Sequence, residues 1–254
     1  MSQRPIRTFG GGLLGALVLA VSGPALADPS RLVVWAWERP EDLRFLPPDT
    51  EIAVQTAFIE IRGADLFVRA RRFPLLARPE QVTTAVAHVQ IRRHQVPVWS
   101  DALAERLAEA VVRLTAPGHP QRVQLDFEVR ASQRQMLLDT VRAVRRRLPA
   151  GTILSMTALA SWCDTEDWLG AAEVDEVVPM LFRMGPQGEG LMQALTNGAD
   201  FAQPACRTAL GIAADLPPGR APTGRRVYLF NPRSWTADRF TQVRERVEAW
   251  GTAH

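Results

Sequence analysis

Apolar stretches of strand length recur along most of the chain, and this recurrence constrains the fold more than any other feature. Several stretches are rich in β-branched residues and show no polar alternation, as is typical of strands covered on both faces. They are residues 32–37, 52–61, 66–71, 84–91, 123–129, 152–159, 176–182, 208–213 and 227–230. From Val98 onward they alternate with helical patterns, which indicates a parallel sheet in an α/β fold.

Amphipathic segments lie between and after the later strands. Residues 101–114, 133–148 and 237–250 carry apolar side chains at helical spacing, and weaker patterns occur near 165–171 and 189–195. Eight or nine strands in one domain favour a single (β/α)8 TIM-barrel-like fold with few helices in its N-terminal third. An open doubly wound sheet is the alternative.

The start of the chain has the pattern of a cleavable secretory signal peptide. Arg4 and Arg7 precede an apolar run too short to cross a bilayer, and a small-x-small cleavage site ends at Ala27. We therefore expect a signal peptide over residues 1–27 and a mature domain over 28–254. The mature protein is predicted to be periplasmic or secreted, with no membrane insertion after cleavage.

The charged residues argue against several partners and chemistries. The chain holds 30 basic and 27 acidic side chains, and every basic one is arginine. Loss of Arg4 and Arg7 would leave a nearly neutral domain, which gives no electrostatic argument for nucleic acid or anionic membranes. The absence of lysine excludes Schiff-base chemistry. The histidines lack metal-ligand spacing, so we expect no metal. We also expect no cofactor, and we expect the protein to be a monomer.

Two cysteines, Cys163 and Cys206, belong to a chain predicted to reach an oxidising compartment. This setting favours a disulfide. The predicted element order, however, puts Cys163 after one strand and Cys206 before another, which could place them at opposite ends of the fold. The sequence leaves their pairing open.

One predicted strand carries acidic residues on a single face. Gln124, Asp126 and Glu128 alternate with apolar residues, so in a barrel they point inward and rise toward the carboxyl ends, where barrel active sites lie. An ionised Asp126 would raise the pKa of Glu128, and a carboxyl protonated near neutral pH can act as a general acid. The alternative is that both carboxylates pair with arginines, such as Arg130 or Arg183, in structural ion pairs.

Tryptophans near the ends of predicted strands offer flat faces for sugar rings, although each one singly is more often a core residue. Trp37 ends the first strand and Glu38 follows it directly. Trp162 and Trp235 follow later strands. We expect a few of the seven tryptophans to face a cleft.

Several segments resemble the bacterial family called domain of unknown function 3142. They are residues 123–134, 154–163 and 174–185, together with Val34-Trp-Ala-Trp-Glu-Arg-Pro40. The resemblance spans most of the mature chain. It implies a barrel related to glycoside hydrolases, with no established activity.

A more distant likeness is to the family 18, chitinase-type, glycoside hydrolases. Their fourth strand carries Asp-x-Asp-x-Glu, in which the glutamate is the general acid, and Gln124-Leu-Asp126-Phe-Glu128 is similar to it. The likeness implies that Glu128 is the acid and Asp126 its supporting carboxylate. Gln124, however, replaces the first aspartate.

The same family has Met-x-Tyr on the sixth strand and a tryptophan after the eighth. Met180-Leu-Phe182 and Trp235 resemble those positions. Phe182 lacks the hydroxyl that would hold the substrate's acetamido group, so the likeness does not carry substrate-assisted cleavage over to this chain.

The sequence thus predicts an exported glycoside-hydrolase-like barrel that acts on a polysaccharide or cell-wall glycan by general acid catalysis. Glu128 and Asp126 are the predicted catalytic residues. The predicted substrate-binding residues are Trp37, Glu38, Trp162, Met180, Phe182, Arg183 and Trp235. The alternative is a non-catalytic glycan- or partner-binding barrel of the cell envelope.

Overall fold

The computed structural model describes residues 31–182, 184, 188–215 and 220–250. The predicted signal peptide, the first residues of the predicted mature domain and Arg183 lie outside the described residues. Within those ranges, no helix is both long enough and apolar enough to span a membrane.

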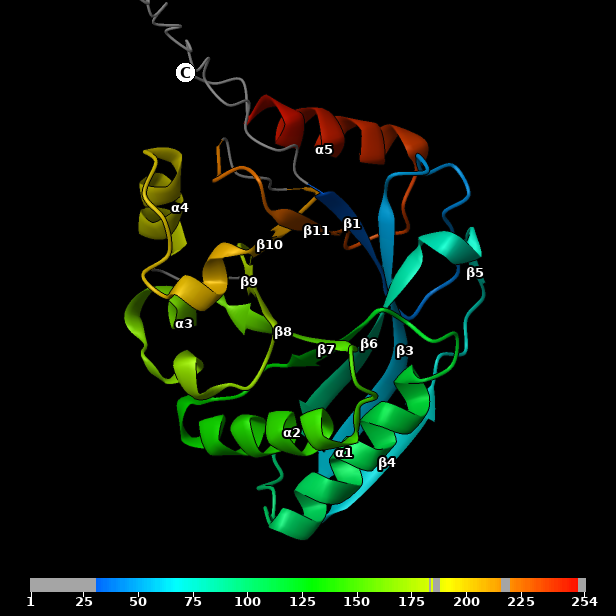
Figure 1. The fold of residues 1–254 in the computed structure, drawn as a ribbon, viewed down its shortest axis with the longest axis vertical. Coiled ribbons are helices and arrows are strands. Elements are labelled where there is room, and N and C mark those ends of the chain that lie inside the picture. The colour runs from blue at the N-terminus through cyan, green and yellow to red at the C-terminus, as the bar shows by residue number, and fades with distance from the viewer. Residues whose placement is uncertain (1–30, 183, 185–187, 216–219, 251–254) are drawn as a thin grey trace, which may run out of the picture.

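Eight parallel strands of the described chain close into a barrel (Figure 1). In order around the ring they are β1 (Arg31–Ala36), β3 (Glu51–Arg62), β6 (Val82–Ile91), β7 (Arg122–Phe127), β8 (Ile153–Leu159), β9 (Glu176–Met180), β10 (Ala209–Ala213) and β11 (Arg226–Phe230). The ring closes because β1 pairs with both β11 and β3: Val33 lies beside Tyr228, and Trp35 lies beside Ala53. The TIM-barrel-like fold is therefore confirmed, and the open doubly wound sheet is wrong.

The first third of the barrel holds strands and turns where the later part holds helices. β4 (Asp65–Ala70) folds back antiparallel on the second half of β3, and Gly63, with φ +62°, turns the chain between them. β2 (Glu41–Asp42) and β5 (Leu75–Leu76) form a separate two-stranded sheet, and the 3-10 turn η1 (Pro79–Gln81) precedes β6. This arrangement confirms the predicted scarcity of helices there.

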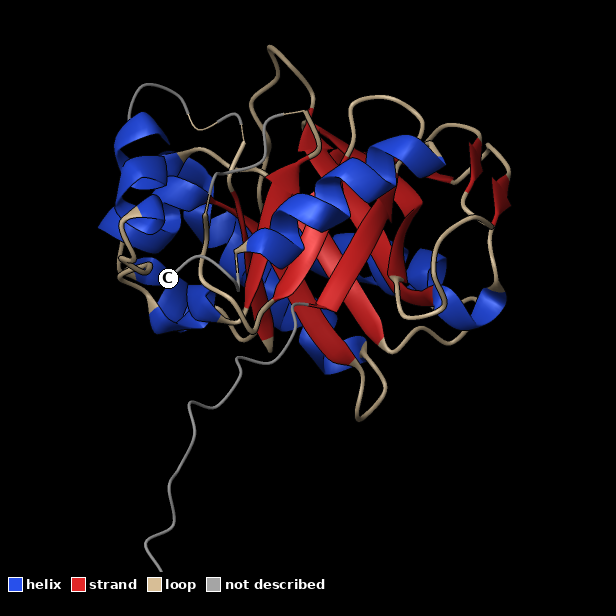
Figure 2. Ribbon diagram, turned by 90° about the horizontal axis from the view of Figure 1, so that it is seen from above, coloured by secondary structure: helices blue, strands red, loops and turns tan. Residues whose placement is uncertain are grey.

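Helices surround the later strands, as Figure 2 shows from above. The long ones are α1 (Asp101–Thr115), α2 (Arg134–Arg147) and α5 (Ala237–Ala249), close to the three predicted ranges. The shorter ones are η2 (Ala131–Gln133), α3 (Ala160–Thr165), η3 (Trp168–Ala171), α4 (Gly188–Thr196) and η5 (Pro204–Arg207). α1 and α5 begin where they do because the side chains of Ser100 and Thr236 accept hydrogen bonds from the first-turn backbone.

Strand alternation divides the apolar residues into two cores. On β1, Val34 and Ala36 face outward into the large core between the barrel and its helices. Val33 and Trp35 face inward, into a small core inside the barrel. The inner core is small because polar side chains occupy much of the barrel interior.

The amino ends of the strands carry a buried cluster of charges. Arg122 Nε lies 3.2 Å from Glu176 Oε1, and Arg226 Nη1 lies 2.5 Å from Glu51 Oε1. Tyr228 donates its hydroxyl to Glu176 at 2.7 Å. Burial, together with the charge of Glu176, holds the pKa of Tyr228 well above its usual value. Two arginines balance two glutamates here, so the charges of this cluster cancel.

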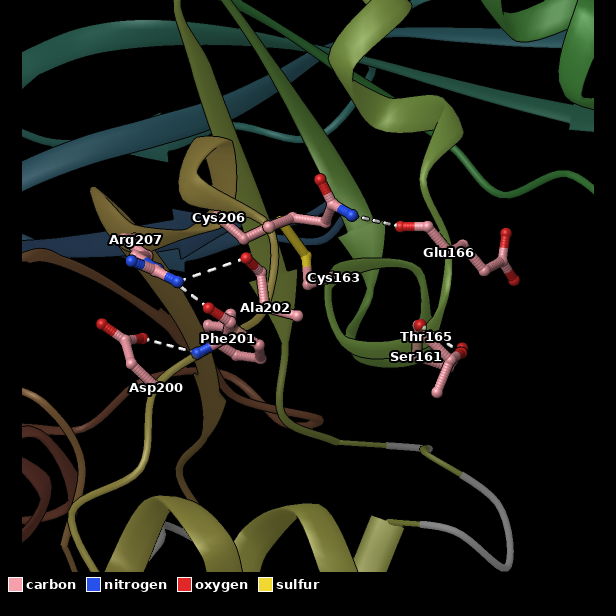
Figure 3. The surroundings of a disulfide bond; sticks show 10 residues. Ser161, Cys163, Thr165, Glu166, Asp200, Phe201, Ala202, Cys206 and Arg207 are labelled. Carbon is pink, nitrogen blue, oxygen red and sulfur yellow. Dashed lines mark hydrogen bonds between the residues drawn. A yellow bond between two sulfur atoms is a disulfide. The ribbon is translucent and has the colours of Figure 1, made fainter.

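Cys163 of α3 and Cys206 of η5 form a disulfide (Figure 3). Both segments pack against β9, and this brings together two residues 43 positions apart in the sequence. Gln203 strengthens the junction: its backbone N–H donates to Cys163 O at 2.9 Å, and its side chain donates to Glu166 O at 2.6 Å. The pairing that the sequence left open is therefore present.

Candidate functional site

A line of hydrogen bonds crosses the middle of the barrel. Trp35 Nε1 donates to Gln124 Oε1 at 2.8 Å, Gln124 Nε2 donates to Ser155 Oγ at 3.1 Å, and Ser155 Oγ donates to Glu176 at 2.9 Å. Gln124 is fully buried, and both ends of its amide are bonded. It therefore belongs to the closed interior and not to an open site.

Asp126 lies one layer above Gln124, near the carboxyl end of β7. Its Oδ2 is 2.6 Å from Nδ1 of His88 on β6, and its Oδ1 accepts a hydrogen bond of 2.8 Å from Thr157 on β8. Within the described residues, no arginine pairs with Asp126. Arg130, one of the two arginines named in the alternative, therefore does not neutralise Asp126, and Arg183, the other, lies outside the described residues.

His88 is the residue at this site that sequence reasoning missed. Burial disfavours its charged form, but the hydrogen bond to Asp126 and the charges of Asp126 and Glu128 outweigh burial and raise the pKa of the imidazole. The ring of Trp37 lies edge-on to it, with centroids 6.0 Å apart, and Phe58 lies on another side. The available signal was the strand register, which sets His88 directly beside Asp126.

Glu128 stands on the rim of the barrel. β7 ends at Phe127, so Glu128 comes after the strand and is exposed, whereas Asp126 is buried. The predicted inward position is therefore confirmed for Gln124 and Asp126, whereas Glu128 lies one residue past the strand and is exposed. Glu128 is still near enough to His88 for its charge to help raise the imidazole pKa.

A groove of about 740 Å³ runs along the carboxyl ends of β6, β7 and β8, and Glu128 lines it. Its charged lining also includes Arg92, Arg93, Arg130, Arg134 and Glu166. The carboxyl ends of barrel strands are where this fold carries its active sites. The groove is therefore the part of the described chain that best fits a ligand-binding site.

Aromatic rings fill the upper centre of the barrel. Phe182 stacks on Phe230 with centroids 5.0 Å apart, and Trp37 meets Phe230 edge-on at 6.0 Å. Trp37 and Phe182 are partly exposed. The indole N–H of Trp37 is buried and has no acceptor among the described residues, so a ligand oxygen could accept this bond.

Trp162 and Met180 are both nearly covered. Trp162 is 4% exposed, lines the groove and packs against Trp168 at 5.0 Å between ring centroids. Met180 is 6% exposed and belongs to the inner core. Each supports a wall of the site with little surface of its own.

The structure holds Glu38 and Trp235 away from the groove. Glu38 pairs with Arg69 at 2.7 Å and accepts a hydrogen bond of 2.7 Å from the backbone N–H of Arg72. Trp235 is buried in the outer core against Phe240, and its indole N–H donates to Trp35 O at 3.3 Å. Of the predicted substrate-binding residues in the described part of the chain, Trp162 lines the groove, and Trp37 and Phe182 are partly exposed in the aromatic cluster outside its lining.

No family model matches the sequence, and no curated protein matches it either. Two solved structures are similar. One is a candidate chitinase A from Streptomyces coelicolor, with 14% identity, a TM-score of 0.55, and coverage of 88% of this chain and 99% of that one. The other is an endo-β-N-acetylglucosaminidase from Cordyceps militaris, with 12% identity, a TM-score of 0.46, and coverage of 87% and 91%.

The first of these likenesses shows that the chain shares a barrel fold with a chitinase-type protein. In fold, it supports the distant resemblance noted for the segment from Gln124 to Glu128. The resemblance to the domain of unknown function 3142 family is not confirmed, because no family model matches.

Proposed function

We propose that this protein is an exported, glycoside-hydrolase-like barrel that acts on a polysaccharide or cell-wall glycan, with Glu128 as the general acid. The observation that carries the proposal is the position of Glu128. It is a carboxyl group at the carboxyl end of a barrel strand, on the wall of a groove of about 740 Å³. A general acid needs such access to both substrate and solvent.

In this proposal, Glu128 gives its proton to the leaving oxygen of the glycosidic bond, and as that bond breaks a water molecule attacks the anomeric carbon and releases its own proton to solvent. Asp126 lies below it as the supporting carboxylate. His88 and Thr157 hold Asp126 in place by one hydrogen bond to each of its oxygens. Because Phe182 carries no hydroxyl, the proposal does not depend on an acetamido group of the substrate.

Trp37 and Phe182 are the proposed contacts for a sugar ring. Both are aromatic and partly exposed at the barrel mouth, and sugars stack their apolar faces on such rings. The buried indole N–H of Trp37, which has no acceptor among the described residues, would donate to a sugar hydroxyl once ligand binding uncovers it. Predicted export fits this role, because glycans of the envelope and surroundings lie where the protein is sent.

A second candidate function, glycan binding without turnover, is favoured by a specific observation. Both oxygens of Asp126 already have partners in His88 and Thr157. If these bonds persist when a glycan is bound, Asp126 cannot turn to assist Glu128. The barrel would then bind its ligand and release it unchanged.

The test is Glu128→Gln, assayed by release of reducing ends from a panel of soluble polysaccharides. We expect a loss of about 100-fold or more, the usual contribution of a general acid. Glu109→Gln, at an exposed position of α1, makes the same chemical change outside the groove and should retain full activity. Full activity in Glu128→Gln would refute its role as the acid.

The same protein samples separate the two candidates. The non-catalytic function would be established if wild type binds a glycan of the panel but forms no product from it. In that case Glu128→Gln should bind the glycan as tightly as wild type, and Trp37→Ala should not bind it. Catalysis would be established if wild type forms product and Glu128→Gln does not.

A further inference from the structure

We propose that the glycan held in the groove is acidic, with carboxylate or sulfate groups on its sugar rings. This inference rests on the proposed function of the same site, and it names the class of substrate. It comes from the charges that line the groove at the carboxyl ends of β6, β7 and β8.

Positive side chains outnumber negative ones along the groove, because four arginines face two glutamates. Arg134 pairs with Glu166, so these two charges cancel. Arg92 reaches only Glu60, at 3.9 Å, and Arg62 binds the same oxygen more closely, at 2.5 Å.

Arg93 and Arg130 carry the remaining excess. Neither has a carboxylate within ion-pair distance among the described residues, and both are exposed. Single solvated arginines are ordinary at a protein surface. Two of them in one concave site, with Arg92 only weakly paired, raise the local positive potential and attract anions.

The excess is local to the groove. The chain as a whole is close to neutral, with 30 basic and 27 acidic side chains, so a general basic character does not explain it. The groove also offers little for a neutral sugar to stack on, because Trp162, the aromatic residue in its wall, is only 4% exposed. The charged side chains of the groove would therefore add ionic contacts to the aromatic ones proposed for Trp37 and Phe182.

Guanidinium groups suit this task better than a diffuse positive charge would. Each is planar and can donate two parallel hydrogen bonds to one carboxylate or sulfate group. Since Glu128 lines the same groove as Arg93 and Arg130, acidic rings bound by these arginines would lie near the bond being cleaved. Arg93 and Arg130 would then fix the register of the chain relative to the acid.

The test measures binding by isothermal titration with polygalacturonate, dextran sulfate and the same polygalacturonate after chemical reduction of its carboxylates to alcohols. We expect the charged polymers to bind at least about tenfold more tightly than the reduced one. Their affinity should fall as the ionic strength rises from ~0.01 M to ~0.15 M, because salt screens exposed charges.

The double variant Arg93→Gln/Arg130→Gln should lose about tenfold or more of its affinity for the charged polymers. Arg113→Gln/Arg246→Gln is the matched control, since it removes the same charge from the last turns of α1 and α5. The inference would be overturned if the reduced polymer binds as tightly as the unreduced one. It would also be overturned if the two double variants have equal affinity for the charged polymers. A preference between polygalacturonate and dextran sulfate identifies the anionic group that the arginines select.

The outcome is distinct from that of the catalytic test. If Glu128→Gln and wild type bind acidic polymers equally and neither cleaves them, the substrate class stands and the catalytic role fails. If wild type cleaves neutral glycans and Arg93→Gln/Arg130→Gln is as active as wild type, the catalytic role stands and the acidic substrate fails.

Discussion

The pair formed by His88 and Asp126 predicts a pH-dependent stability that can be measured without a substrate. In the folded protein, the pKa of the His88 imidazole lies above its usual value of 6.5. The folded protein therefore binds this proton more tightly than the unfolded chain does. The pair therefore adds stability that is fully present below about pH 6.5 and is lost as the pH rises through the raised pKa.

The size of the effect follows from the contact. A hydrogen bond to a charged partner contributes about 1.5–3 kcal/mol. The imidazole side chain is 31% exposed, so solvent screening reduces this contribution, whereas Asp126 is only 7% exposed. We expect a coupling free energy of about 1–2 kcal/mol near pH 6 and a clearly smaller one near pH 9.

The measurement is a double-mutant cycle of His88→Gln, Asp126→Asn and the double variant, each unfolded in urea at both pH values. Asparagine keeps an acceptor for Thr157, so the cycle isolates the charged contact with His88. Tryptophan fluorescence reports unfolding, and Trp37 lies beside the mutated pair. A coupling below about 0.5 kcal/mol at pH 6, or one that does not change with pH, would refute the reasoning.

Two further predictions concern the packing around the site. Gly211→Ala should destabilise the protein by about 1–3 kcal/mol, because the new Cβ would lie 2.9 Å from the buried ring of Trp35. Gly190→Ala, with nothing within 4 Å of its new Cβ, is the control, and equal urea midpoints would contradict the prediction. Replacing Cys163 and Cys206 by serine opens a loop with 43 positions between its ends and should cost up to about 4 kcal/mol. The thermal midpoint of that variant should not respond to reductant, whereas the wild-type midpoint should fall.

The barrel itself could be predicted because it depends on local patterns. Continuous apolar runs predicted the inner strands, and helical spacing predicted α1, α2 and α5 to within a residue or two. Alternation along β7 correctly placed Gln124 and Asp126 inside the barrel. These features follow from the backbone geometry of single elements and need no knowledge of their neighbours.

The features that could not be predicted depend on contacts between elements. His88 meets Asp126 only through the register of β6 against β7. Cys163 meets Cys206 only because α3 and η5 pack on the same strand. Trp235 lies after the last strand as predicted, yet its ring turns into the outer core. One-dimensional patterns carry little of this information, because register and side-chain direction are set when the ring closes.

The amide of Gln124 also gives a physical reason for placing the proposed general acid at the rim of the barrel and not in its interior. The interior already holds Glu51 and Glu176, and their charges are matched by two arginines. An aspartate at position 124 would add a buried negative charge beside Ser155 and Trp35, and among the described residues no further cation contacts this position to match it. The neutral amide avoids this cost and still bonds both neighbours. A carboxylate is thus stable at Asp126 near the end of β7, because His88 supplies the opposite charge. It is also stable at Glu128, just after the strand, because that residue is exposed to solvent.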